Sequence, residues 1–107
     1  MNVTALSSEK DLQLRTSITI TLPRGCEQYS NDIRRFINAM LYKLEINAGK
    51  GRWQDINSQE SLEKLMEEAI ELREALQTDN TVSILLEAAD VANFALIIAS
   101  KELDGEK

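Results

Sequence analysis

The positions of the apolar residues along the chain predict three helices. In residues 30–48, apolar side chains recur every three or four positions, at Ile33, Phe36, Ile37, Met40, Leu41 and Leu44, which is the period of an amphipathic helix. Residues 65–99 contain two further helical segments joined by a short polar stretch, residues 78–81. So short a connection joins antiparallel neighbours. We therefore expect these two segments to form a helical hairpin.

Residues 14–22 have a different period, because apolar and polar side chains alternate. Ile18, Ile20 and Leu22 share one side, which predicts a β-strand ended by Pro23 and Gly25. A lone strand in a helical chain pairs with its copy in another subunit or lies extended along the helices. We expect a single domain in residues 1–107, with an N-terminal strand or extended arm in residues 1–25 and a helical core in residues 26–107.

The last predicted helix is apolar on nearly every side, so it is expected to be buried. A chain of 107 residues with 43% apolar content builds only a thin core. Two further helices cannot easily cover such a helix, which favours self-association. The predicted fold class is all-α: a helical hairpin and a preceding helix that form a four-helix-type bundle in a homo-oligomer, either a dimer or a tetramer.

Charge and composition exclude several classes of function. The net charge of −6 and the absence of a basic tract argue against nucleic acid or a membrane surface as the main partner. The chain contains no histidine, which excludes His-based zinc sites and Ser-His-Asp triads. A single cysteine, Cys26, fits a reducing cytoplasm. The first residues lack a hydrophobic run, and Glu87, Asp90 and Asn93 interrupt the apolar run of the last helix, so neither a signal peptide nor a membrane span is expected.

Two clusters of acids lie in the hairpin, at matching distances from its turn. Taking the turn's centre near Asp79, Glu71 and Glu87 are equally distant from it, and so are Glu68 and Asp90. Buried carboxylates that face one another repel unless a counter-charge lies among them. The sequence offers too few inward-facing cations to supply that charge. A bound divalent ion, Mg²⁺ first with Mn²⁺ or Ca²⁺ as substitutes, is the interpretation preferred over a solvated acidic face.

The acidic residues also carry a resemblance to a known family. EEAIE at residues 67–71, followed by EAAD at residues 87–90, resembles the EExxE and ExxD signature of the MazG-like, all-α nucleoside triphosphate pyrophosphohydrolases. The resemblance implies Mg²⁺-dependent cleavage of a nucleotide to a monophosphate and pyrophosphate, in the service of nucleotide-pool house-cleaning. By position it implies that Glu68, Glu71, Glu87 and Asp90 are metal ligands. Glu67 would then be an extra carboxylate, and Glu67 or Glu71 would orient or deprotonate the attacking water.

A glycine-flanked loop is the second functional signal. Gly49 ends the first helix, and Asn57 with Glu60, or Ser58, is expected to cap the next one. The stretch KLEINAGKGRW resembles a KLxxNxxKGxW pattern of MazG-like proteins. That resemblance implies phosphate contacts from Lys50, with Lys43 and Arg52 as further candidates, against the alternative that these are solvated cations. Trp53 stacks on a base or packs on the core, and Asn47 belongs to the same pattern.

Two residues one turn past Asp90 complete the candidate substrate site. Phe94 falls where related pyrophosphatases place an aromatic ring against the sugar or base. Asn93 binds a sugar hydroxyl or makes a helix–helix contact. Two other functions remain open: phosphoribosyl-ATP or dUTP hydrolysis on the same scaffold, and a non-catalytic helical oligomer that uses the hairpin as an interface.

Overall fold

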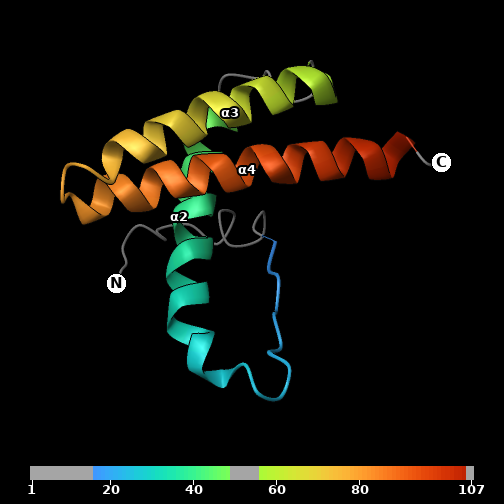
Figure 1. Ribbon diagram of the computed structural model, residues 1–107. Coiled ribbons are helices and arrows are strands. Elements are labelled where there is room, and N and C mark those ends of the chain that lie inside the picture. The colour runs from blue at the N-terminus through green and yellow to red at the C-terminus, as the bar shows by residue number, and fades with distance from the viewer. Residues whose placement is uncertain (1–15, 49–55, 106–107) are drawn as a thin grey trace, which may run out of the picture.

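The computed structural model describes residues 16–48 and 56–105, and its regular elements are all helices (Figure 1). A short 3-10 turn, η2 (Glu27–Tyr29), leads into α2 (Ser30–Ala48). The hairpin consists of α3 (Ser58–Ala75) and α4 (Thr81–Gly105). The predicted all-α class is therefore confirmed for these residues, and the first helix has the bounds that its hydrophobic period predicts.

The start of α3 is determined by its capping residues. The side chain of Asn57 accepts a hydrogen bond from the backbone N–H of Glu60 at 2.8 Å, and Glu60 Oε1 accepts one from the N–H of Asn57 at 3.2 Å. This reciprocal capping box satisfies two donors that would otherwise lack partners at the helix end. The predicted pairing of Asn57 with Glu60 is confirmed.

The turn of the hairpin is stabilised by polar side chains. The hydroxyl of Thr78 donates to the carbonyl of Ala75 at 2.7 Å, near the C-terminal end of α3. Asp79 adopts a positive φ of 59°, a conformation that Asp tolerates better than most residues. The side chain of Asn80 then accepts from the N–H of Ser83 at 3.0 Å and caps α4. Residues of the turn itself thus cap the end of α3 and the start of α4.

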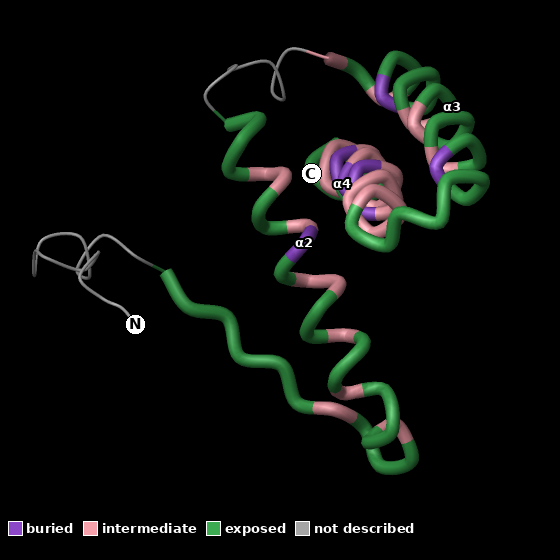
Figure 2. Tube along the Cα trace, turned by 90° about the vertical axis from the view of Figure 1, so that its left-hand side faces the viewer, coloured by how far each residue is buried: buried purple, intermediate pink, exposed green. Residues whose placement is uncertain are grey.

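The hairpin forms one layer, and α2 crosses it steeply. In both views α3 and α4 lie side by side, while α2 packs against α4 and its N-terminal part projects away (Figures 1 and 2). Small side chains lie at the contacts: Ala39 of α2, Ser61 and Ala75 of α3, and Ala89 of α4 are buried. Small residues let helix backbones approach closely. The steep crossing brings one face of α2 against the middle of α4.

The single chain leaves much of its apolar surface exposed. Leu62, Met66 and Ile70 form an exposed row along α3, and Met66 is 60% exposed. On α4, Leu96 and Leu103 are also exposed. Within one chain α4 is therefore only partly covered, as the sequence predicts, because a single hairpin and one crossing helix enclose only part of its circumference. Self-association stays a prediction.

By length and composition alone, α4 also satisfies the test for a membrane span. Its mean hydropathy over the most apolar window is 1.9, and 22% of that window is buried. A core helix of a helical bundle passes the same test. Glu87 and Asp90 lie within this helix, and charged side chains at such positions are costly in lipid.

The predicted N-terminal strand is absent from the described part of its range. Residues 16–22 of the predicted strand form no regular secondary structure, and they run as an extended segment beside the projecting part of α2 (Figure 1). Ile18 is 83% exposed and Ile20 is also exposed. Among the described residues no second strand pairs with this stretch, so the alternative of an extended arm agrees with the structure. Pairing with a copy in another subunit stays a prediction. The remaining residues of the predicted arm lie outside the described residues.

Candidate functional site

Three glutamates of the two hairpin helices converge, and Asp90 lies beside them. Carboxylate oxygens of Glu68, Glu71 and Glu87 lie within 4.8 Å of one another. Asp90 is buried one turn along α4, and its charge acts on both Glu68 and Glu87. We call Glu68, Glu71, Glu87 and Asp90 the acidic cluster. Helical spacing aligns the acids within each helix, and the antiparallel turn brings the two pairs to the same height, as the sequence predicts.

The electrostatics of the acidic cluster oppose full ionisation. Burial, together with the negative charges of Glu71 and Asp90, raises the pKa of Glu68 to about 7. Burial also raises the pKa of Glu87, with added repulsion from Glu71 and Asp90 and a smaller opposing effect of Lys43. Desolvation and like charges both favour the neutral carboxyl. The cluster therefore needs more positive charge than its surroundings provide.

One oxygen of the acidic cluster lacks a partner. Among the described residues, Glu87 Oε2 is buried and accepts no hydrogen bond. An unpaired buried acceptor is unfavourable by about 1–3 kcal/mol, and by more if it carries charge. Several carboxylate oxygens at short mutual distances are the donor set that Mg²⁺ and related hard ions prefer. Glu68, Glu71 and Glu87 could therefore hold a divalent cation. Asp90, the fourth predicted ligand, is not among the three acids whose oxygens lie within 4.8 Å of one another, and its carboxylate pairs with Lys43.

A cleft of about 640 Å³ opens beside the acidic cluster, between α2 and the hairpin. Glu68 and Asp90 belong to its wall, and so do Lys43 and Asn47 of α2 and Phe94 of α4. Phe94 is half-buried and Asn47 is exposed. The cleft thus combines acid, amine, amide and aromatic groups, and its volume is in the range of small-molecule sites.

Lys43 provides positive charge at the acidic cluster. Its Nζ lies 3.2 Å from Asp90 Oδ2, and the two side chains are only 22% and 11% exposed. The sequence indicated Lys43 only as a candidate for phosphate contact or as a solvated cation, and this ion pair was not predicted. The seven-residue spacing from Phe36 places Lys43 on the apolar stripe of α2 and could have indicated an inward position. One inward amine still leaves three acids of the cluster uncompensated when all four are ionised.

Asn93 makes the helix–helix contact that the sequence left as one of two alternatives. Its Nδ2 donates to the backbone carbonyl of Met40 at 3.0 Å and ties α4 to α2. In the described part of the chain, Asn93 Oδ1 is buried without a hydrogen-bond partner, and the residue lines the cleft. The amide therefore has one acceptor position unused.

The other predicted site residues lie at the edge of the cleft or outside the described residues. Glu67 lines the cleft but is not part of the acidic cluster: its side chain is 63% exposed and lies 3.9 Å from the amine of Lys64. Lys50, Arg52 and Trp53 fall in the range 49–55, outside the described residues. Lys64 and Glu60 also line the cleft, and sequence reasoning did not single out Lys64.

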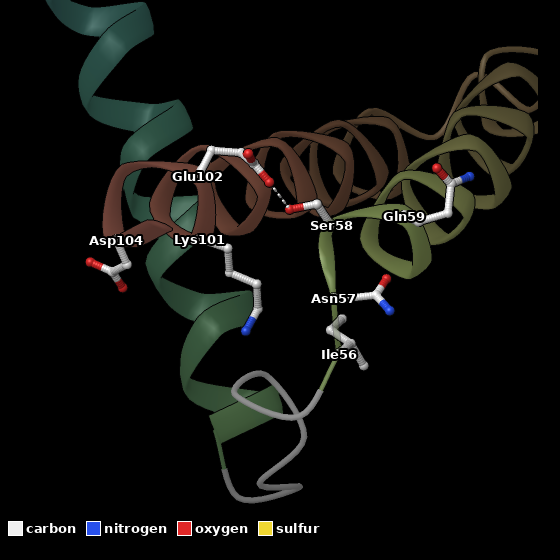
Figure 3. A pocket seen from close by; sticks show the side chains of 7 residues that line it. All are labelled: Ile56, Asn57, Ser58, Gln59, Lys101, Glu102 and Asp104. Atoms are coloured by element: carbon white, nitrogen blue, oxygen red, sulfur yellow. Dashed lines mark hydrogen bonds between the residues drawn. The ribbon is translucent and has the colours of Figure 1, made fainter. Parts of the chain in front are cut away.

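A second hollow, of about 680 Å³, lies at the open end of the hairpin (Figure 3). Ser58 at the start of α3 donates a hydrogen bond to Glu102 near the end of α4 at 2.5 Å. Lys101 and Asp104 also line it. Its side chains include two carboxylates, and the nearby start of α3 is already capped by its own residues, so the hollow has no concentrated charge of one sign. The acidic cluster and its cleft are the stronger candidate site.

No model of a protein family, no curated protein and no solved structure matches the chain.

Proposed function

We propose that the chain is a Mg²⁺-dependent pyrophosphohydrolase that converts a nucleoside triphosphate to its monophosphate and pyrophosphate. The observation that carries the proposal is the convergence of Glu68, Glu71 and Glu87, with a buried unpartnered oxygen, beside a cleft that holds Lys43 and Phe94. The resemblance of residues 67–71 and 87–90 to MazG-like enzymes supports the same reaction. A triphosphate is the kind of anion that would need both a metal and a nearby amine in so acidic a chain.

Different residues of the site would bind the metal, the phosphates and the nucleoside. Glu68, Glu71, Glu87 and Asp90 would hold the ion; when bound, it would neutralise phosphate oxygens and lower the pKa of a water molecule. Lys43 would neutralise further phosphate charge from the α2 side of the cleft. Phe94 would provide an apolar wall for the nucleoside.

An exposed acid of the acidic cluster would accept the proton of the attacking water. Glu71 is the member of the cluster that is exposed, so a water molecule can reach its carboxylate. Glu71 would accept the proton as the water oxygen forms its bond to the α-phosphorus. The bond from that phosphorus to the bridging oxygen breaks at the same time, and the electron pair leaves with pyrophosphate. Glu67, which pairs with Lys64 at the rim, is less suited to this role.

We also propose that the active form is a homo-oligomer. Leu62, Met66 and Ile70 of α3 lie on one exposed row, and Leu96 and Leu103 are exposed on α4. At about 100° per residue, these residues lie on the flank of the hairpin away from the acidic cluster. Covering this flank with a second copy would complete a four-helix arrangement and leave the cleft open.

A nucleotide panel tests the proposed activity. Each nucleoside triphosphate is incubated with the full chain, with Mg²⁺ or with EDTA, and pyrophosphate is measured. We expect metal-dependent release that falls by about 100-fold or more in Glu71→Gln, the size of effect typical for removing a general base. Glu74→Gln is the matched control, because Glu74 is an exposed glutamate of the same helix. Circular dichroism verifies that both variants fold.

Two outcomes would contradict the proposal in different ways. Undiminished activity in Glu71→Gln would show that cleavage occurs elsewhere. Absence of pyrophosphate release from every nucleotide, together with absence of Mg²⁺ binding by calorimetry, would favour the non-catalytic helical oligomer instead.

A further inference from the structure

The ion pair between Lys43 and Asp90 differs from the other ion pair at the cleft. Lys43 crosses from α2 to α4, its amine is 3.2 Å from the carboxylate, and both side chains are largely buried. Lys64 and Glu67 pair within α3 at 3.9 Å, and their side chains are 56% and 63% exposed. Exposed pairs of this kind contribute little. The ammonium of Lys43 therefore interacts more strongly with the acidic cluster than the ammonium of Lys64 does.

Lys43 occupies a position that a divalent cation would also favour. Asp90 is buried beside Glu68 and Glu87, whose carboxyls it repels. An ammonium group placed on Asp90 reduces that repulsion, and it lowers the pKa of Glu87 relative to the effect of the acids alone. A cation held by the same carboxylate oxygens would repel the ammonium group at short distance. The ammonium of Lys43 and a divalent cation therefore compete for the same carboxylate oxygens, and each weakens the binding of the other.

The lysine also has somewhere to move. Its flexible four-carbon stem lets the ammonium reorient about rotatable bonds, and its side chain lines the cleft together with Asn47 and Phe94. An ammonium displaced from Asp90 can therefore turn toward the open cleft without any change in the course of α2. There it would face whatever anion the cleft holds.

We propose that Lys43 is an exchangeable counter-ion: it occupies Asp90 when no metal is bound, and metal binding releases its ammonium into the cleft as a phosphate ligand. Lys43 acts in this way only if the acidic cluster holds a metal, as proposed above. The exchange makes metal and phosphate binding mutually supportive, because an anion that attracts the ammonium also removes a competitor of the metal. Such coupling is reciprocal between the two ligands.

Three variants of the full chain test the exchange by calorimetric titration with Mg²⁺ alone, without nucleotide. Lys43→Met removes the competing charge and keeps the length of the side chain. We expect it to bind Mg²⁺ on the order of tenfold more tightly, because a unit charge at this distance in a partly buried site changes the interaction by at least that much. Lys43→Arg keeps the charge and should bind Mg²⁺ about as the unaltered chain does. Lys64→Met removes the same charge from the rim, and its effect should be much smaller.

In a second titration, with pyrophosphate, we expect Lys43→Met to change the affinity in the opposite direction. With Mg²⁺ at saturation, magnesium pyrophosphate should bind Lys43→Met more weakly than the unaltered chain, because the released ammonium is missing. A purely structural lysine would not tighten one ligand and weaken the other. Equal or weaker Mg²⁺ binding by Lys43→Met would overturn the exchange. An unaltered chain that binds no Mg²⁺ would instead refute the metal site itself.

A further variant separates loss of the Lys43 charge from loss of the fold. Lys43→Gln retains a polar group that can donate to Asp90 without carrying charge, so it should keep the helical circular dichroism and still show tighter Mg²⁺ binding. Loss of the helical fold in both Lys43→Met and Lys43→Gln would show that the ion pair is structural. That result would also overturn the exchange.

Discussion

Replacing Glu68 by glutamine should make the metal-free chain more stable at neutral and alkaline pH. The pKa of Glu68 rises from its ordinary value of 4.5 to about 7, chiefly because of burial and then because of Glu71 and Asp90. At about 1.4 kcal/mol per tenfold change in proton affinity, ionising this group in the folded chain costs at most about 3.5 kcal/mol. Solvent screening of a half-buried side chain reduces the expected gain to about 1–2 kcal/mol.

The sign of the pH dependence follows from proton linkage. The folded chain binds the Glu68 proton more tightly than the unfolded chain does, so this group lowers the free energy of unfolding as pH rises from about 4.5 to about 7. Glutamine is neutral throughout. The advantage of Glu68→Gln over the unaltered chain should therefore be largest at pH 8 and should fade as pH falls toward 4.5.

Thermal unfolding with EDTA at a series of pH values measures the effect. A domain of this size gains roughly 4–8 °C in Tm for each kcal/mol. Glu63→Gln is the matched control, since Glu63 is an exposed glutamate on the same helix, and it should change Tm little at any pH. Addition of Mg²⁺ should then raise the Tm of the unaltered chain more than that of Glu68→Gln. A Glu68→Gln variant that is destabilised at pH 8, or a gain that does not depend on pH, would refute the reasoning.

Two further predictions concern assembly and local stability. Met66→Lys places a charge on the exposed apolar row of α3 and should convert the expected oligomer to monomers in sedimentation experiments, whereas a lysine at the exposed position Glu63 should not; an unchanged mass would mean that this row is not the interface. Asn57→Ala removes the capping oxygen of α3 and should lower the free energy of unfolding by about 1 kcal/mol, as measured by urea denaturation. Unchanged stability there would show that Ser58 or solvent caps the helix equally well.

The sequence by itself determined the parts of this protein that depend on local spacing. The bounds of α2 follow from the period of its apolar residues, and the start of α3 follows from Asn57 and Glu60. The convergence of Glu68, Glu71 and Glu87 also follows from sequence, because regular helices and a short turn set the heights of side chains in a hairpin. Each of these features is governed by residues a few positions apart or by one antiparallel pairing.

Only the tertiary structure decided how α2 meets the hairpin. The crossing geometry depends on which small side chains meet, and hydrophobic period does not specify it. This crossing brings Lys43 against Asp90, directs Asn93 to the carbonyl of Met40 and leaves part of α4 uncovered. The predicted strand likewise required a partner strand, which residues 16–48 and 56–105 do not provide, since the ladder hydrogen bonds of a strand are all made to its neighbour. Contacts between elements distant in sequence thus determined which positive charge lies beside the acidic cluster. Local periodicity had already determined where the acids of the cluster lie.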